Sequence, residues 1–232
     1  MTPPDRPTRI VFALFPGVTQ LDFTGPHQLL AITPGMAPVA ASMGGAVIES
    51  HGLQFCGLEA LEDIADCDVL CVPGGAVLGA ISDEAFLAQL RRLAGTARYV
   101  TSVCTGSLLL AAAGLLQGRR AACHWAFRDQ LAKFGAIPDE ARVVRDGDIL
   151  TGGGITAGID FALALIAELA GERTAQMSQL MVEYAPAPPF QSGRPETAPA
   201  EVLAAAQAFS GPMMAAQAAA IEAAAARVME TA

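Results

Sequence analysis

Residues 99–108 read YVTSVCTGSL, and they join a β-rich apolar run to a helix-forming run that continues to Leu116. The strand-like part stops at Cys104. A side chain at such a sharp strand-to-helix turn projects outward and the following amides point at it, an arrangement that suits a nucleophile. A helix N-terminus also favours negative charge, so we expect the Cys104 thiol to ionise more easily than a free thiol. The alternative is a small buried hydrophobic residue.

Strand-like and helix-like runs alternate on both sides of this turn. The run DVLCV at 68–72 is continuously apolar after its first residue, which is typical of a strand buried on both faces. Further strands are expected at 9–15, 39–43 and 120–123, hairpins at 46–55 and 142–151, and helices at 26–32, 82–94 (capped by Ser82), 125–134, 156–169 and 172–183. The repeated βα order predicts an α/β fold, a parallel sheet sandwiched between helices.

The C-terminal region differs from this pattern. Five of the residues between 186 and 199 are proline, which indicates an arm or a linker. Two helices are expected after it, at 200–209 and 212–229. In the second of these helices, one face is apolar, and we expect it to pack on the domain or on a second copy of the chain. This face consists of Met214, Ala218, Ile221, Ala225 and Val228. We therefore divide the chain into a domain at 8–190 and C-terminal helices at 191–232.

Composition excludes several classes of function. The net charge of −9 and the pI of about 4.7 leave no basic face for nucleic acid. No uncharged apolar run approaches the roughly 18 residues of a membrane span, and no signal core opens the chain, so we expect a soluble, cytoplasmic protein. The five cysteines lack paired spacing or a complete zinc set, which indicates reduced residues in or near the core and no metal site.

Other candidate residues follow the predicted strands. The carboxyl ends of parallel strands meet at one edge of a sheet, where ligands bind. Asp22 follows the first strand in a loop, and Gly75 follows the 68–72 strand. The Gly75 and Thr105 amides are expected to form an anion hole beside Cys104. The alternatives are a helix cap for Asp22 and a simple turn for Gly75.

Two further regions are accessory candidates. His124 lies 20 residues after Cys104, and a Cys–His pair is the usual arrangement that activates a thiol. A strand-end histidine bonded to backbone is a serious alternative. Gly153 and Ile155 belong to the run that opens the 156–169 helix. We expect the glycines at 152–154 either to permit close backbone approach or to let the helix move when Cys104 is modified. Asp160 is expected to have a structural role.

Five motifs occur in order: LDFTGP at 21–26, VPGG at 72–75, TSVCTG at 101–106, HW at 124–125 and TGGGITAGID at 151–160. Together they resemble the PfpI superfamily of class I glutamine amidotransferase-like proteins, over about residues 9–190. The resemblance implies a flavodoxin-like parallel-sheet sandwich, a homodimer with the nucleophile near its interface, and no cofactor. It also implies that Cys104 is the nucleophile, Asp22 its carboxyl partner, and Thr105 a neighbour of the reacting group.

Within the superfamily the motifs are most similar to the branch that hydrates isocyanides. Many other branches have glutamate in the first loop, whereas this chain, like that branch, has the shorter aspartate, Asp22. The implied reaction turns a small apolar isocyanide and water into an N-substituted formamide through a thioimidate on Cys104. A redox sensor of the same superfamily and a glyoxalase-like hydratase are the alternatives, and a protease is least favoured. Related motifs occur in AraC-type regulators, but the 33 residues after Pro199 contain one basic residue, Arg227, which argues against DNA binding.

Overall fold

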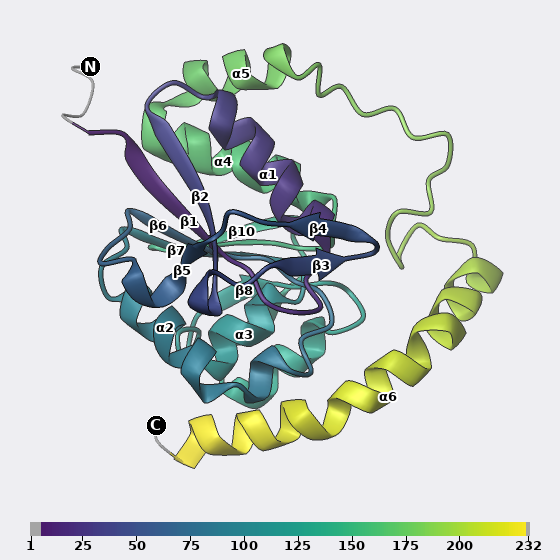
Figure 1. Cartoon of the computed structure of the whole chain (residues 1–232). Helices are drawn as coiled ribbons and strands as arrows, with labels where there is room; N and C mark the ends of the chain where they lie inside the picture. The colour runs from purple at the N-terminus through teal and green to yellow at the C-terminus, as the bar shows by residue number, and fades with distance from the viewer. Residues whose placement is uncertain (1–5, 231–232) are drawn as a thin grey trace.

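A computed structural model describes residues 6–230, and its centre is a seven-stranded sheet (Figure 1). The strand order is β10-β11-β7-β6-β1-β2-β5, and every neighbouring pair is parallel except β10 with β11. The strands are β1 (Thr8–Ala13), β2 (Met36–Ser42), β5 (Glu59–Ala60), β6 (Val69–Val72), β7 (Tyr99–Val103), β10 (Val143–Asp146) and β11 (Ile149–Gly152). Two small sheets accompany it: the expected hairpin of β3 (Ile48–Ser50) with β4 (Leu53–Phe55), and the parallel pair β8 (Arg120–Ala122) with β9 (Ile137–Asp139).

Helices cover both faces of the sheet, which confirms the predicted α/β architecture. One layer contains α1 (Gln20–Ile32), α4 (Ala157–Ala170) and α5 (Glu172–Met181), and the other contains α2 (Glu84–Ala94) and α3 (Gly106–Ala112) (Figure 1). Short 3₁₀ helices connect them: η1 (Met43–Gly45), η2 (Leu61–Asp63), η3 (Ala80–Ser82) and η4 (Arg128–Phe134). The crossovers between parallel strands require such helical connections.

Several helix ends differ from the predicted ones. Helix α1 begins at Gln20, six residues before the expected start, so Asp22 lies in its first turn and not in a loop. Pro26 lies inside this helix, and because proline has no backbone N–H it cannot donate to the Asp22 carbonyl. Gly158 of α4 packs against Pro26, since a Cβ at position 158 would lie 3.1 Å from Pro26 Cδ. The cap of α2 is Asp83, whose Oδ1 accepts from Phe86 N at 3.1 Å, and not Ser82. Of the helix expected at 125–134, the structure forms only η4.

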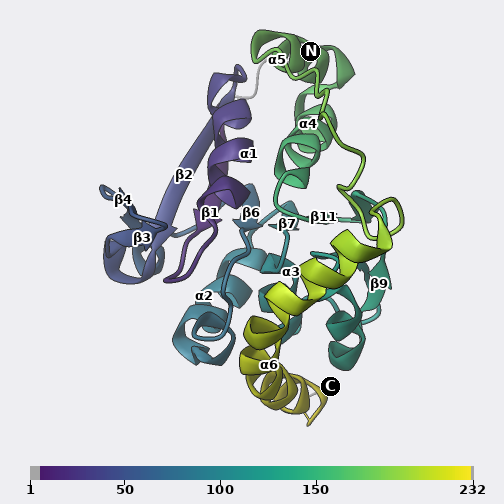
Figure 2. The ribbon, with the colours of Figure 1, turned by 90° about the vertical axis from the view of Figure 1, so that its right-hand side faces the viewer.

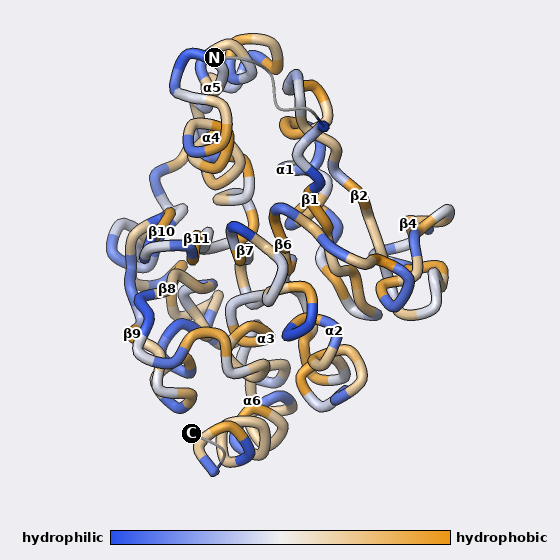
Figure 3. Tube along the Cα trace, turned by 90° about the vertical axis from the view of Figure 1, so that its left-hand side faces the viewer, coloured by the Kyte–Doolittle hydropathy of each residue, from blue (hydrophilic) through white to orange (hydrophobic). Residues whose placement is uncertain are grey.

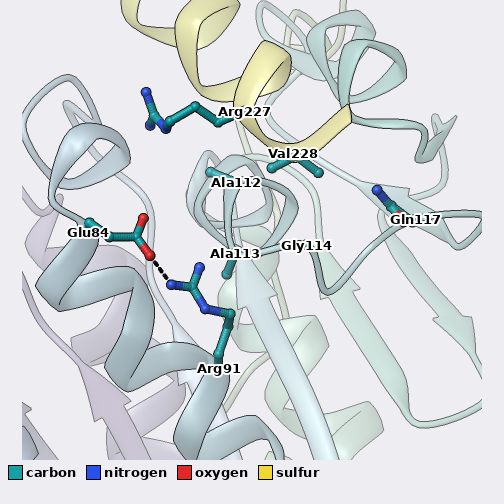
Figure 4. A pocket seen from close by; sticks show the side chains of 8 residues that line it. All are labelled: Glu84, Arg91, Ala112, Ala113, Gly114, Gln117, Arg227 and Val228. Carbon is teal, nitrogen blue, oxygen red and sulfur yellow. Dashed lines mark hydrogen bonds and ion pairs between the residues drawn. The ribbon is translucent and has the colours of Figure 1, made fainter. Parts of the chain in front are cut away.

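The C-terminal region forms one helix, α6 (Ala200–Glu230), where two were expected. Pro212 lies within it. The loss of one backbone hydrogen bond at a solvent-facing position is tolerated, because water can satisfy the freed carbonyl. Of the predicted apolar face, Ile221, Ala225 and Val228 are buried and Met214 is partly buried, whereas Ala218 is exposed. Gln217, which was not predicted, is buried as well. Figure 2 shows α6 passing beside α3, and in Figure 4 Val228 lies close to the end of α3 at Ala112.

The core follows the central strands. Strands β6 and β7 are buried along their whole lengths, and hydrophobic positions are prominent along β1 and α4 in Figure 3. All five cysteines are free; four are buried, but Cys56 is exposed, contrary to the expected core or near-core position. Across residues 6–230 the structure contains no helix with both the length and the apolar character needed to cross a bilayer.

Candidate active site

Cys104 occupies the turn between β7 and α3 in a left-handed backbone conformation, with φ of +60°. Such a conformation is uncommon for a residue other than glycine and marks functional sites when the surrounding structure enforces it. Here the Cys104 N–H donates to the Gly152 carbonyl at 3.0 Å. The next turn of chain passes so close to β6 that a Cβ on Gly106 would lie 2.1 Å from the Val72 oxygen. Glycine at 106 therefore makes this turn possible.

Cys104 lines a cavity of about 590 Å³, although only 5% of the residue is exposed. Segments distant in sequence form its walls: the β1–α1 loop, the β3–β4 hairpin, the loop after β6, the turn after β7, the chain from β8 to η4, the start of the α4 region, and α6. The lining residues are Gly17, Val18, Thr19, Glu49, Ser50, His51, Gly75, Ala76, Cys104, Thr105, His124, Phe127, Ile155, Phe209 and Met213. The cavity is thus the place where the strand ends converge, as expected for this sheet type.

Asp22 is completely buried beside this turn. Its Oδ2 accepts from the Gly74 N–H at 2.9 Å, whereas its Oδ1 has no hydrogen-bond partner among the described residues. Burial raises the pKa of Asp22 from its ordinary 3.8 to about 7, against smaller lowering effects of the Gly74 amide and the Cys104 thiol. A carboxyl group with one unpartnered oxygen and a pKa near neutrality is suited to moving protons. Its bond runs to Gly74 and not to its own helix, so the capping alternative does not describe it.

The thiol of Cys104 does not ionise easily in this environment, contrary to the prediction. Burial raises its pKa well above the usual value, and the negative charge of Asp22 raises it further. The Thr105 amide, which donates toward the sulfur, lowers the pKa but does not compensate. Desolvation is the largest of these effects. Ionisation of Cys104 is therefore unfavourable without a base, and Asp22 is the carboxyl group whose charge acts on this thiol.

Gly75 and Thr105 are joined in a small ring of hydrogen bonds. The Gly75 N–H donates to Thr105 Oγ1 at 2.8 Å, and that hydroxyl donates to the Gly75 carbonyl at 2.9 Å. The predicted anion hole from both amides is not present in this geometry, because the Gly75 N–H is taken up by the hydroxyl. Gly75 has a φ of +147°, and a Cβ there would lie 2.2 Å from the Gly17 oxygen. Gly75 is therefore better described as a turn glycine than as an anion-hole residue.

His124 lines the cavity with a neutral ring. Its Nδ1 accepts from the Ala126 N–H at 3.3 Å, and burial lowers its pKa. His124 therefore fits the description of a strand-end histidine bonded to backbone. His124 and Ile155 also line an adjoining cavity of about 220 Å³, to which Gly153 contributes. Gly153 donates to the Arg142 carbonyl at 2.9 Å, but a Cβ on it would lie no closer than 3.5 Å to its neighbours, so close backbone approach does not require glycine at this position.

Other features of the structure were partly anticipated. Asp160 is structural, as expected: its Oδ2 accepts from Arg142 Nε at 2.8 Å and from the Tyr184 hydroxyl at 3.0 Å. Sequence reasoning missed His51, Phe209 and Met213 as cavity residues. A tight turn in the 46–55 hairpin could have singled out His51, whose φ is +52°. No local signal in the sequence could have brought α6 to this cavity.

Another cavity, of about 450 Å³, lies between α2, α3 and α6 (Figure 4). It is lined by the ion-paired Glu84 and Arg91 and shares no residue with the Cys104 cavity. It contains no thiol or hydroxyl nucleophile among its lining residues, so it is not the candidate site. Among the residues described, no group of three or more histidine, cysteine or acidic side chains is placed to hold a metal ion.

Comparison with known proteins defines the family. The model of the DJ-1/PfpI family matches residues 8–168, and the chain belongs to this family. An isonitrile hydratase of Pseudomonas putida is 54% identical over 208 residues, which cover 89% of this chain and 91% of that protein. A solved ThiJ/PfpI family protein from Pseudomonas syringae is 40% identical, with a TM-score of 0.86 over 94% of this chain and 90% of that one. Drosophila melanogaster DJ-1beta, 23% identical, shares the fold, with a TM-score of 0.69 over 78% of this chain and all of its own.

Proposed function

We propose that this protein is an isonitrile hydratase, which converts an isocyanide and water to an N-substituted formamide. The observation that supports this most is the buried Cys104–Asp22 pair beside a cavity, in a chain 54% identical to the P. putida hydratase. The burial of Cys104, which is only 5% exposed, argues against the redox-sensor alternative, because sensor cysteines are solvent-accessible. The chemistry follows from one proton shared between the two side chains.

In the first step, the Asp22 carboxylate removes the Cys104 proton as the sulfur attacks the terminal carbon of R–N≡C. The new Asp22 carboxyl group then delivers this proton to the same carbon. An S–C bond and a C–H bond form, the C–N triple bond becomes double, and the product is the thioimidate R–N=CH–S on Cys104. Asp22 returns to the carboxylate.

In the second step, water adds to the thioimidate carbon while Asp22 accepts a water proton. The tetrahedral adduct collapses: its hydroxyl proton, the second proton of the water, moves to the nitrogen, the C=O bond forms and the C–S bond breaks. The products are R–NH–CHO and the Cys104 thiolate, which regains its proton from Asp22. Each atom of water is accounted for, and no step requires a metal ion or an organic cofactor.

Thr105 supports both steps through its backbone and its side chain. Its amide donates toward the Cys104 sulfur and stabilises negative charge there as it develops. Its hydroxyl fixes the loop at Gly75, which borders the cavity. Neutral His124 and apolar Ile155 are proposed as walls of the substrate site, and neither is given a proton-transfer role.

We also propose the finer points of organisation that the resemblance implied: a cytoplasmic homodimer, with residues 191–232 added to the domain of residues 8–190. Exposed apolar side chains that include Leu180, Met181 and Phe190 support an interface between two copies. Sedimentation equilibrium of the purified chain tests the dimer. A mass of about 48 kDa, twice the 23.8 kDa of one chain, is expected, and a monomer at micromolar concentration contradicts it.

Turnover of cyclohexyl isocyanide tests the reaction itself. The wild type is expected to produce N-cyclohexylformamide, followed by the formyl proton in NMR spectra. Cys104→Ala should be inactive, whereas the matched control Cys56→Ala, which removes an exposed thiol, should keep wild-type rates. Absence of formamide from the wild type, or full activity of Cys104→Ala, contradicts the proposed function.

A further inference from the structure

Helix α6 is an addition to the core that defines the family. The family model ends at residue 168, whereas α6 spans Ala200–Glu230. DJ-1beta is matched over its whole length and yet covers only 78% of this chain. An element outside the shared core that reaches the catalytic cavity is a natural source of differences in substrate choice.

The C-terminal half of α6 is fixed to the domain. Gln217 is buried there, and its Oε1 accepts from the Val77 N–H at 3.1 Å. Val77 lies two residues after Gly75, so this bond ties α6 to the loop that borders the cavity. Ile221, Ala224 and Ala225 are buried on the same side of the helix. These contacts set the position of the preceding turns, which lie over the cavity.

Phe209 and Met213, one helical turn apart on α6, both line the Cys104 cavity. They nevertheless leave much apolar surface in water, because Phe209 is 90% exposed and Met213 is 47% exposed. Burial of such a side chain is favourable, roughly in proportion to the apolar area removed from water. An apolar ligand in the cavity gains part of this energy when it covers them.

We propose that Phe209 and Met213 bind the N-substituent of the substrate and select bulky apolar isocyanides over small ones. This inference rests on the proposed function. The isocyanide group is linear, so when its terminal carbon reaches Cys104 the substituent points away from the sulfur and into the cavity. The apolar side chains that line it include Val18, Phe127, Ile155 and the pair on α6. The core supplies the chemistry, and α6 completes the binding site.

Steady-state kinetics with two substrates tests this role. In Phe209→Ala and Met213→Ala, the ratio of kcat/KM for cyclohexyl isocyanide to that for methyl isocyanide should fall about tenfold, mainly through KM for the larger substrate. Met229→Ala is the matched control, since Met229 is 54% exposed on the same helix and does not line the cavity. Its ratio should equal that of the wild type. An unchanged ratio in Phe209→Ala and Met213→Ala overturns the inference.

Thiol alkylation provides a second readout that does not depend on turnover. In a Cys56→Ser background, Cys104 is alkylated with N-cyclohexylmaleimide or N-ethylmaleimide, and its peptide is quantified by mass spectrometry. Phe209→Ala should lower the preference for the cyclohexyl reagent, and Met229→Ala should not. If the wild type hydrates neither isocyanide, the proposed function fails, whereas the maleimide preference still decides whether α6 binds bulky apolar groups. An equal preference in wild type and Phe209→Ala overturns that conclusion.

Discussion

In the proposed mechanism Asp22 and Cys104 exchange a proton, and the protonation state of the pair sets the pH dependence of activity. Below the Asp22 pKa of about 7 both groups are protonated, and no base remains to ionise the thiol. Above it the pair holds one proton, which is the reactive state. We predict that kcat/KM rises tenfold per pH unit below pH 7 and levels off above it. A profile measured between pH 5 and 9 checks this, and constant activity down to pH 5 contradicts it.

The same carboxyl group makes stability depend on pH. Because the folded pKa of about 7 exceeds the ordinary 3.8, the folded protein retains a proton that the unfolded chain loses, and stability falls as pH rises to 7. Between pH 5 and 8 this loss is roughly 3 kcal/mol at about 1.36 kcal/mol per pH unit. The Asp22→Asn variant has no titrating group at this position, so it does not undergo this loss of stability. Its side-chain oxygen still accepts from the Gly74 N–H.

We therefore predict that the Tm of Asp22→Asn, relative to wild type, rises by roughly 5–10 °C when the pH is changed from 5 to 8. Its turnover should fall by about 10²–10⁴, because proton transfer is lost while the fold remains. Calorimetry at the two pH values and the formamide assay measure both effects. A constant Tm difference, or near-normal turnover, contradicts the role of Asp22. Asp63→Asn, in the η2 turn, is the control.

At the scale of elements, the loop after β6 must approach the start of α3 closely. A Cβ on Gly74 would lie 2.5 Å from the Thr105 nitrogen and 2.7 Å from Asp22 Oδ2. Gly79, in the same connection, has open space and an ordinary φ of −71°. Gly74→Ala should cost several kcal/mol of stability and abolish turnover, whereas Gly79→Ala should change stability by less than about 1 kcal/mol. Urea unfolding and the formamide assay compare the two, and equal behaviour contradicts this packing.

The order of the elements follows from the sequence because apolar periodicity and turn residues are local. Their ends depend on contacts that are not local. Asp22 was expected in a loop because Pro26 resembles a helix start, yet Gly158 of α4 accommodates that proline inside α1. Cys104 was identified correctly as a turn residue, but its pKa was predicted in the wrong direction because burial cannot be read from a motif. The Gly75 hydrogen bond to Thr105 likewise depends on folded geometry.

At the scale of the whole molecule, Gln217 holds α6 on the domain. Gln217→Ala leaves the buried Val77 N–H without this partner, which should cost about 1–3 kcal/mol. Urea unfolding checks the value, and Gln207→Ala, at an exposed position of the same helix, should differ little from wild type. If the Gln217 variant is as stable as the control, the described docking of α6 is wrong.

The prolines between residues 186 and 199 predict a division into a domain and a C-terminal region, and this division stays a prediction. The role of the C-terminal region could not be predicted. The apolar periodicity of residues 212–229 indicated the packed face, on which Ile221, Ala225 and Val228 are buried, but it gave no sign of buried Gln217, whose Oε1 accepts from the distant Val77 N–H. Phe209 and Met213 approach Cys104 through that docking, over about a hundred residues of intervening chain.

The covalent thioimidate on Cys104 is the central claim about mechanism, and rapid acid quench with mass spectrometry tests it most directly. Wild-type protein is mixed with one equivalent of cyclohexyl isocyanide, and the peptide containing Cys104 is followed over time. The account predicts a mass increase equal to one substrate molecule on Cys104, which decays at the rate at which N-cyclohexylformamide appears. Formamide production with no adduct on Cys104 would contradict the account.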